Sequence, residues 1–136
     1  MKKEKQSAKI LIIDDDIDFI NATKMILETK SYEILFAYDK DAGMKIIETE
    51  RPDLIILDVM MKRLSDGFKL CYQLKHDPKY KNIPVIIVTA VTKETGLRFS
   101  PETDGEYLEA EDLISKPIKP DDLLNKVENL LMGKRL

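Results

Sequence analysis

The sequence predicts an α/β protein built on a parallel β-sheet. Short apolar runs of strand length recur along the chain, and segments with helical patterns separate them. Three of these runs, LII, LIIL and VIIV, do not alternate apolar and polar residues, which is typical of strands buried on both faces of a sheet. Because repeated strand and helix units form doubly wound sheets with right-handed crossovers, we expect a three-layer αβα arrangement.

Five runs are expected to form the strands of this sheet: KILII (9–13), YEILFAY (32–38), DLIIL (53–57), IPVIIV (83–88) and DLIS (112–115). Apolar residues at helical spacing mark three of the helices between and after these strands. The three stripes are Phe19, Ala22 and Ile26; Phe68, Cys71 and Leu74; and Leu123, Val127, Leu130 and Leu131.

The chain length and composition indicate one globular domain. At 136 residues with 43% hydrophobic residues, the chain has room for a single modest core. We expect the domain at 9–132, a flexible N-terminal tail at 1–8 and a C-terminal tail at 133–136.

The charge balance and the single cysteine bear on partners and location. The 22 Lys and Arg residues nearly balance 25 Asp and Glu residues, which gives no indication of direct nucleic-acid binding. No apolar run approaches the roughly 20 residues that cross a bilayer, and no signal peptide is evident, so membrane insertion is not expected. A lone Cys71 fits a reducing compartment. We therefore expect a cytoplasmic protein.

Four carboxylates follow or end predicted strands. Asp14, Asp15 and Asp16 come directly after the first strand, and Asp58 follows the third. In a sheet of strand order 2-1-3-4-5, the ligand site lies at the carboxyl ends of strands one and three. Carboxylates converging there repel by about 1 to 4 kcal/mol per pair at roughly 4 Å. A hard divalent cation such as Mg²⁺ would offset this repulsion.

Two more side chains at strand ends complete a predicted site for phosphoryl chemistry. Thr89 follows the fourth strand and Lys116 follows the fifth. A hydroxyl group can donate a hydrogen bond to a phosphoryl oxygen, and an ammonium group can neutralise its charge. In this setting the Asp58 carboxylate becomes a candidate nucleophile that forms an acyl phosphate.

At these positions the sequence resembles the receiver domain of two-component response regulators, which has the flavodoxin-like fold of the chemotaxis regulators. The resemblance covers roughly residues 9–131 and rests on four motifs in the family's order: KILIIDDD, DLIILDVMM with DGF downstream, IPVIIVTA and DLISKPIKP. It also implies a cis peptide bond between Lys116 and Pro117.

The resemblance implies a role for each site residue. Asp58 would accept a phosphoryl group from a sensor histidine kinase or a phosphotransfer protein. Asp15, Asp58 and the Met60 carbonyl would hold Mg²⁺, with Asp14 supporting the metal through water. Thr89 and Lys116 would contact the phosphoryl group. The domain would not be an enzyme in the ordinary sense, would lose its phosphoryl group slowly, and would signal by binding a downstream protein.

The sequence departs from the family pattern at three places. Lys62 stands where a proline is usual, and the loop KRLS (62–65) that it begins is longer. Leu113 replaces an aromatic residue that members use as a rotamer switch. The span from Thr89 to Lys116 is several residues longer than usual, and its segment 91–111 contains Gly96, Pro101 and Gly105. We expect an atypical, mobile fourth helix in that segment, which would become ordered on phosphorylation.

Two other functions fit parts of the pattern. IIDDDI also matches the signature of haloacid-dehalogenase phosphatases, in which Asp14 would be the nucleophile and Asp16 the acid; that family gives no reason for Asp58. Alternatively, the chain is a pseudo-receiver that binds partners without being phosphorylated, which Lys62 and Leu113 favour. As a structural alternative, Asp16 is expected to cap the first helix.

Overall fold

The computed structural model describes residues 7–59, 64–89 and 110–135 of the chain. These residues form five strands and four helices: β1 (Lys9–Ile13), α1 (Ile17–Glu28), β2 (Glu33–Ala37), α2 (Lys40–Glu50), β3 (Leu54–Asp58), α3 (Leu64–Lys75), β4 (Val85–Thr89), β5 (Asp112–Ser115) and α4 (Pro120–Arg135). All five predicted strands are confirmed, with ends that differ by at most two residues.

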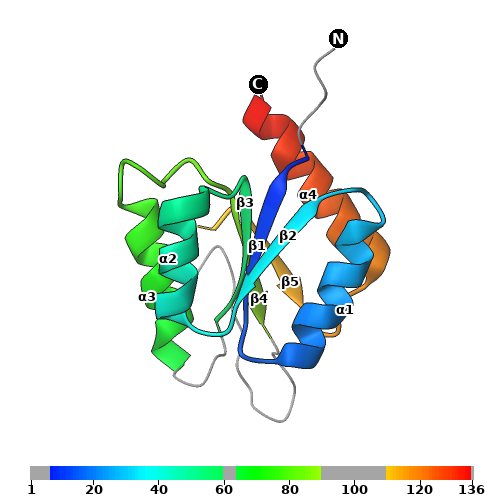
Figure 1. Ribbon diagram of the computed structural model, residues 1–136, viewed down its shortest axis with the longest axis horizontal. Coiled ribbons are helices and arrows are strands. Elements are labelled where there is room, and N and C mark those ends of the chain that lie inside the picture. The colour runs from blue at the N-terminus through cyan, green and yellow to red at the C-terminus, as the bar shows by residue number, and fades with distance from the viewer. Residues whose placement is uncertain (1–6, 60–63, 90–109, 136) are drawn as a thin grey trace.

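The strands form one parallel sheet in the order β2-β1-β3-β4-β5. Helices α1 and α4 lie on one face of the sheet, and α2 and α3 lie on the other (Figure 1). The predicted three-layer α/β class and the strand order are therefore confirmed.

The core consists of two apolar layers separated by the sheet. Alternate residues of β1 enter different layers: Ile10 and Ile12 pack toward α1 and α4, whereas Leu11 and Ile13 pack toward α2 and α3. All four side chains are fully buried. Because each buried Ile or Leu contributes about 1.5 to 3 kcal/mol, the central strands provide a rigid base for the residues at their ends.

Polar side chains and backbone geometry set where the helices begin and end. Asp16 caps α1 by accepting hydrogen bonds from the backbone N–H groups of Asp18 and Phe19, at 3.0 and 3.2 Å. Asp39 caps α2 in the same way. Helix α2 ends at Glu50, and the cap residue Arg51 has a left-handed φ of 50° that stops the helix.

The buried stripe of α1 differs from the predicted one. The sequence-based stripe of Phe19, Ala22 and Ile26 is partly right: Phe19 and Ile26 are half-buried and pack against the core, but Ala22 is exposed. The fully buried residues of the helix are Ile20, Thr23 and Leu27. Two apolar stripes compete on this helix, and the polar Thr23 in the middle of the buried one conceals it in the sequence. With Ile20, Thr23 and Leu27 facing the core, the half-buried Phe19 lies near the carboxyl edge of the sheet.

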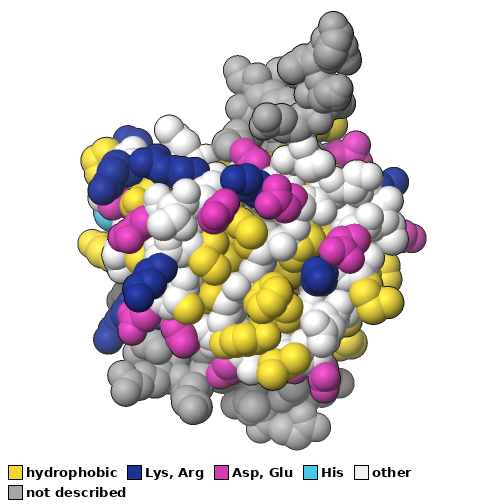
Figure 2. Space-filling model, viewed as in Figure 1, with side chains coloured by type: hydrophobic (Ala, Val, Ile, Leu, Met, Phe, Trp, Pro, Cys, Tyr) yellow, Lys and Arg dark blue, Asp and Glu magenta, His cyan; other side chains and the backbone are white. Residues whose placement is uncertain are grey.

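Strand β2 is an edge strand, and two exposed aromatic side chains lie near its carboxyl end. Phe36 and Tyr38 are 41% and 44% exposed, and their ring centroids lie 5.6 Å apart. Apolar side chains gather in the centre of the face that carries β2 (Figure 2).

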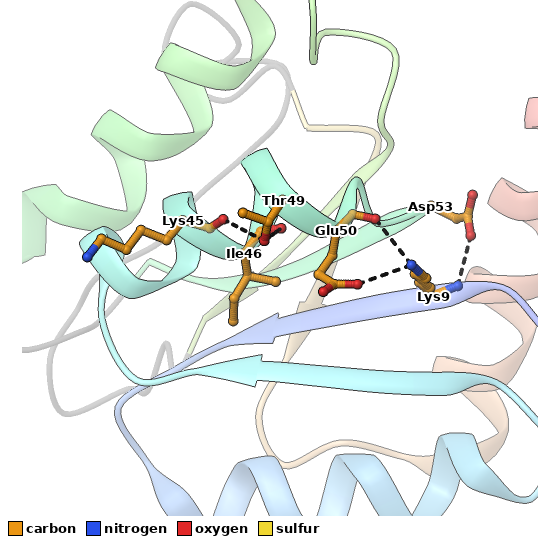
Figure 3. A network of polar contacts seen from close by, with 6 residues as sticks. All are labelled: Lys9, Lys45, Ile46, Thr49, Glu50 and Asp53. Atoms are coloured by element: carbon orange, nitrogen blue, oxygen red, sulfur yellow. Dashed lines mark hydrogen bonds and ion pairs between the residues drawn. The ribbon is translucent and has the colours of Figure 1, made fainter.

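The amino edge of the sheet is closed by a reciprocal set of polar contacts (Figure 3). The backbone N–H of Lys9 donates to Asp53 Oδ2 at 2.8 Å, and the backbone N–H of Asp53 donates to the Lys9 carbonyl at 2.8 Å. The Lys9 ammonium group also pairs with Glu50 Oε1 at 3.1 Å. These contacts join the start of β1 to the chain between α2 and β3.

A second lysine makes polar contacts at the same edge of the sheet, next to the amino ends of β4 and β5. Lys75, whose side chain is 5% exposed, donates to the carbonyls of Lys81 and Ile83 at 3.1 and 2.8 Å and pairs with Glu111 Oε2 at 2.8 Å. The other Glu111 oxygen accepts a hydrogen bond from the Val85 backbone at 2.8 Å. Each oxygen of this carboxylate therefore has a partner.

Several predictions concern the ends of the chain and its loops. Residues 1–6, 60–63 and 90–109 lie outside the described residues. The flexible N-terminal tail and the mobile helix expected in segment 91–111, which is not α4, therefore stay predictions. Helix α4 runs to Arg135, beyond the expected domain boundary at 132. The peptide bond between Lys116 and Pro117 is cis, as the resemblance implied. No helix in the described ranges has the length and apolar character needed to cross a membrane.

Candidate functional site

The carboxyl ends of four strands bring the predicted site residues to one edge of the sheet (Figure 1). Asp14 follows β1, Asp58 and Thr89 are the last residues of β3 and β4, and Lys116 follows β5. The parallel register aligns these ends, because Asp58 lies beside Val88 on β4. This is the edge at which doubly wound sheets bind ligands.

Backbone hydrogen bonds hold the strand ends together as far as the site itself. The N–H of Asp14 donates to the Ala37 carbonyl at 3.1 Å, and that of Lys116 donates to the Thr89 carbonyl at 2.8 Å. The N–H of Val59 donates to the Val88 carbonyl at 3.1 Å. The functional side chains thus project from a fixed backbone rather than from loose loops.

Three carboxylates converge between β1 and β3. Asp14, Asp15 and Asp58 each offer one oxygen, and these three oxygens lie within 4.8 Å of one another. Asp14 and Asp58 are buried, at 0% and 2% exposure, whereas Asp15 is exposed. Hard oxygen ligands with one side open to water suit Mg²⁺, which keeps several of its own water ligands. The cluster could therefore hold a metal ion.

Lys116 places a positive charge beside the two buried carboxylates. Its Nζ lies 3.2 Å from Asp14 Oδ2 and 3.6 Å from Asp58 Oδ2, and its side chain is 20% exposed. The same Nζ lies over the Phe19 ring, 4.3 Å from its centroid. Lys116 and Asp58, both named as site residues from the sequence, therefore lie within ion-pair distance of each other.

Asp14 titrates far from its ordinary range. Burial away from water raises the pKa of this carboxyl group from 3.8 to about 7, and the nearby Asp58 charge adds to the rise. The backbone N–H of Asp16, 2.9 Å from Asp14 Oδ1, and the Lys116 ammonium group lower the pKa of Asp14 and offset part of the rise. Near neutral pH the group is therefore only partly ionised, which reduces its repulsion with Asp58.

Thr89 contributes a buried hydroxyl group. Its side chain is 1% exposed, and within the described ranges Oγ1 has no hydrogen-bond partner. A buried hydroxyl group without a partner is unfavourable by about 1 to 3 kcal/mol. A phosphoryl oxygen bound at this edge would supply an acceptor.

Asp16 does not join the carboxylate cluster. It accepts two backbone hydrogen bonds as the cap of α1, as expected. The haloacid-dehalogenase alternative needs Asp16 as an acid and Asp14 as the nucleophile. Burial raises the pKa of Asp14 to about 7, so fewer of these carboxyl groups are ionised and able to attack a phosphorus atom near neutral pH.

Three positions named from the sequence require separate mention. Met60 and Lys62 lie outside the described residues. Leu113 is half-buried on β5 and packs against the core layer under α2 and α3. An aliphatic side chain in this place gives no aromatic rotamer to report phosphorylation.

Two residues near the site have roles that sequence reasoning did not identify. A Cβ added at Gly67 would lie 2.4 Å from Val59 Cα and 2.7 Å from the Asp58 carbonyl oxygen, so α3 packs against this backbone only with glycine there. The DGF motif gave a signal for this close approach. Phe19 was assigned to the core, and no pattern in the sequence indicates that it lies beside Lys116.

Comparison with known proteins gives a consistent result. The family model of the response regulator receiver domain matches residues 10–128. Protein PilH of Pseudomonas aeruginosa is 32% identical over 126 residues, which are 93% of this chain and 99% of PilH. The alkaline phosphatase synthesis transcriptional regulatory protein PhoP of Bacillus subtilis is 33% identical over 90% of this chain and 48% of its own length. The chain thus spans about half the length of several curated relatives it matches.

Solved structures agree with this fold. A CheY-like response regulator receiver domain protein from Methanospirillum hungatei has a TM-score of 0.81 and 27% identity, covering 96% of this chain and 98% of that one. The chemotaxis response regulator CheY4 of Vibrio cholerae has a TM-score of 0.77 and 28% identity, covering 92% and 99%.

Proposed function

The chain belongs to the response regulator receiver domain family of two-component signalling, and we propose that Asp58 is the residue that accepts its phosphoryl group. The observation that carries this proposal is the position of the Asp58 carboxylate. It ends a buried central strand, lies beside the Lys116 ammonium group, and shares a cluster with Asp14 and Asp15. The phosphatase and pseudo-receiver alternatives are not favoured.

In the proposed reaction, the Asp58 carboxylate attacks the phosphorus atom of a phosphohistidine on the donor protein. The new bond joins an Asp58 oxygen to phosphorus, the bond from phosphorus to the histidine nitrogen breaks, and the nitrogen keeps the electron pair. Lys116, now 3.6 Å from Asp58 Oδ2, neutralises a phosphoryl oxygen. The Thr89 hydroxyl group donates a hydrogen bond to another.

The metal expected at this site is Mg²⁺. Asp15 and Asp58 would bind it directly, together with the Met60 carbonyl predicted from the sequence, and Asp14 would support it through water. When bound, the ion neutralises charge on the phosphoryl oxygens as they approach the carboxylates. The fit rests on the three carboxylate oxygens within 4.8 Å and on the open side at Asp15.

Receiver domains are in general not classical enzymes, and the catalytic part of the proposal is limited to the chain's own phosphorylation. Slow loss of the phosphoryl group to water belongs to the same proposal. The proposed donors are a sensor histidine kinase or a phosphotransfer protein in the cytoplasm, and the proposed output is the binding of a downstream protein. The segment 91–111 is the proposed element that changes on phosphorylation.

The test is an intact-mass measurement of the purified chain after incubation with a small phosphodonor, with Mg²⁺ or with a chelator. We expect a gain of one phosphoryl group with Mg²⁺ and none with the chelator. Asp15→Ala should lose both Mg²⁺ binding and labelling. A wild-type chain that gains no mass in Mg²⁺, or gains it equally in the chelator, would contradict the proposal.

A further inference from the structure

We propose that Phe19 is a positioning residue that holds the Lys116 ammonium group at the place where it meets the phosphoryl group. This inference rests on the function proposed above for Asp58 and Lys116. It assigns to α1 a part in the site that depends on an aromatic ring rather than on a charge.

The Lys116 ammonium group has three close neighbours, an aromatic ring and two carboxylates. Nζ is 4.3 Å from the Phe19 ring centroid, and it is 3.2 and 3.6 Å from oxygens of Asp14 and Asp58. A cation within about 6 Å of a ring centroid is attracted by the electrons of the ring face. The ring therefore adds an attraction that favours the observed position of Nζ and that does not come from the carboxylates.

Phe19 itself is held firmly in the first turn of α1. Its backbone N–H donates to Asp16 Oδ1 at 3.2 Å, and the next residue, Ile20, donates from its backbone to the Asp16 carbonyl at 3.1 Å. The half-buried ring packs against the core layer formed with α1 and α4. The Asp16 cap thus fixes the Phe19 backbone, the core contact holds the ring, and the ring favours one position of the Lys116 ammonium group.

The ring matters most when the carboxylates are engaged by a cation. The flexible four-carbon stem of lysine leaves the ammonium group many positions once Asp14 and Asp58 no longer attract it. Phe19 carries no charge and offers no oxygen, so it attracts Lys116 without competing for Mg²⁺. Its contribution should therefore appear in phosphoryl binding and not in metal binding.

The test compares wild-type protein with Phe19→Leu, Phe19→Tyr and the matched control Phe36→Leu. Leucine keeps an apolar side chain but removes the ring, tyrosine restores the ring, and Phe36 is an exposed aromatic residue on β2. Two quantities are measured in each folded variant. One is the NMR chemical shift of the Lys116 ε-protons, which a ring face moves upfield; the other is the affinity for beryllofluoride, a phosphoryl mimic, in Mg²⁺.

We expect the upfield shift in wild type, Phe19→Tyr and Phe36→Leu, and its loss in Phe19→Leu. Beryllofluoride affinity should fall about two- to fivefold in Phe19→Leu alone, which is the size of an ordinary cation–π contact. Mg²⁺ affinity should not change. Since the shift is read without any phosphoryl group, it tests the contact independently of the proposed function.

Two results would overturn the inference while leaving the proposed function intact. One is beryllofluoride binding by Phe19→Leu with wild-type affinity; the other is a failure of Phe19→Tyr to restore what Phe19→Leu loses. A wild-type protein that binds no beryllofluoride would instead contradict the function proposed for Asp58, and the positioning role would fall with it.

Discussion

The two edges of the sheet use the same kinds of side chain in opposite ways. At the amino edge, the charged groups are matched: Lys9 pairs with Glu50, and Lys75 pairs with Glu111. At the carboxyl edge, three carboxylates gather, and Lys116 pairs with the two that are buried. The Thr89 hydroxyl group there is buried without a partner in the described ranges.

This difference shows where the molecule gives up stability for binding. The ion pairs at the amino edge join strands and helices to one another, and each of these charges is already neutralised within the chain. Burial and the crowding of carboxylates at the carboxyl edge both favour the uptake of protons or cations: burial first, and the nearby Asp58 charge second, raise the pKa of Asp14. A divalent ion would neutralise the crowded carboxylates, and a phosphoryl oxygen would accept a hydrogen bond from the Thr89 hydroxyl group.

The largest effect is expected for Asp58→Asn, which removes the proposed nucleophile and keeps the side-chain volume. Labelling by a small phosphodonor in Mg²⁺ should be abolished, while the fold stays intact because one repulsive charge is gone. The control is Asp53→Asn at the amino edge, where the amide oxygen can still accept from the Lys9 backbone. Full labelling of Asp58→Asn by intact mass would move the nucleophile to another residue, with Asp14 first.

A second large effect concerns the pH dependence of stability. The pKa of Asp14 is about 7 in the folded state against 3.8 ordinarily, so the folded chain binds more protons than the unfolded chain between these values. Its contribution to the free energy of unfolding therefore falls as pH rises from about 4 to 7, by no more than about 4 kcal/mol. Asp14→Asn should remove this fall and be more stable at pH 8.

Denaturant titrations of both proteins in metal-free buffer across this pH range provide the measurement. Parallel curves of unfolding free energy against pH for wild type and Asp14→Asn would mean that Asp14 is not the group responsible.

At the amino edge, Lys75→Met should lower stability without changing the chemistry. The substitution removes an ion pair whose lysine is nearly buried and two hydrogen bonds to backbone carbonyls, which costs about 2 to 3 kcal/mol. Lys45→Met, at an exposed position of α2, is the matched control with no expected loss. Labelling of Asp58 should persist in both. Loss of labelling in folded Lys75→Met would show that the two edges are not independent.

The smallest effect is expected for Lys9→Met. The Lys9 and Glu50 side chains are 35% and 44% exposed, and such surface ion pairs contribute about 0 to 1 kcal/mol. The backbone hydrogen bond to Asp53 does not depend on the side chain and should persist. Thermal unfolding at low and high salt measures the effect; a loss as large as that of Lys75→Met would mean that burial does not distinguish the two pairs.

The sequence predicted the sheet because its signal is strong and local. The unbroken apolar runs of β1, β3 and β4 can be satisfied only by burial on both faces, and each run ends directly at a predicted site residue. The convergence of Asp14, Asp15 and Asp58 followed from strand order alone. These features needed no knowledge of side-chain packing.

The features that the sequence did not predict depend on which face of a helix is buried and on how the helices and strands pack together. The position of the buried stripe of α1 could not be read, because Thr23 interrupts it and a second apolar stripe runs beside it. The contact between Phe19 and Lys116 joins residues far apart in the sequence, and it depends on which face of α1 packs against the sheet. The pKa of Asp14 likewise depends on burial, which spacing does not give.

The measurement that tests the account most directly is the location of the phosphoryl group in the wild-type chain. The phosphorylated protein is reduced with borohydride, which converts an aspartyl phosphate to homoserine, and peptides are then sequenced by mass spectrometry. The account predicts homoserine at position 58 alone, only after incubation with Mg²⁺. Homoserine at position 14 or 15, or none at 58 in a chain that has gained phosphoryl mass, would contradict it.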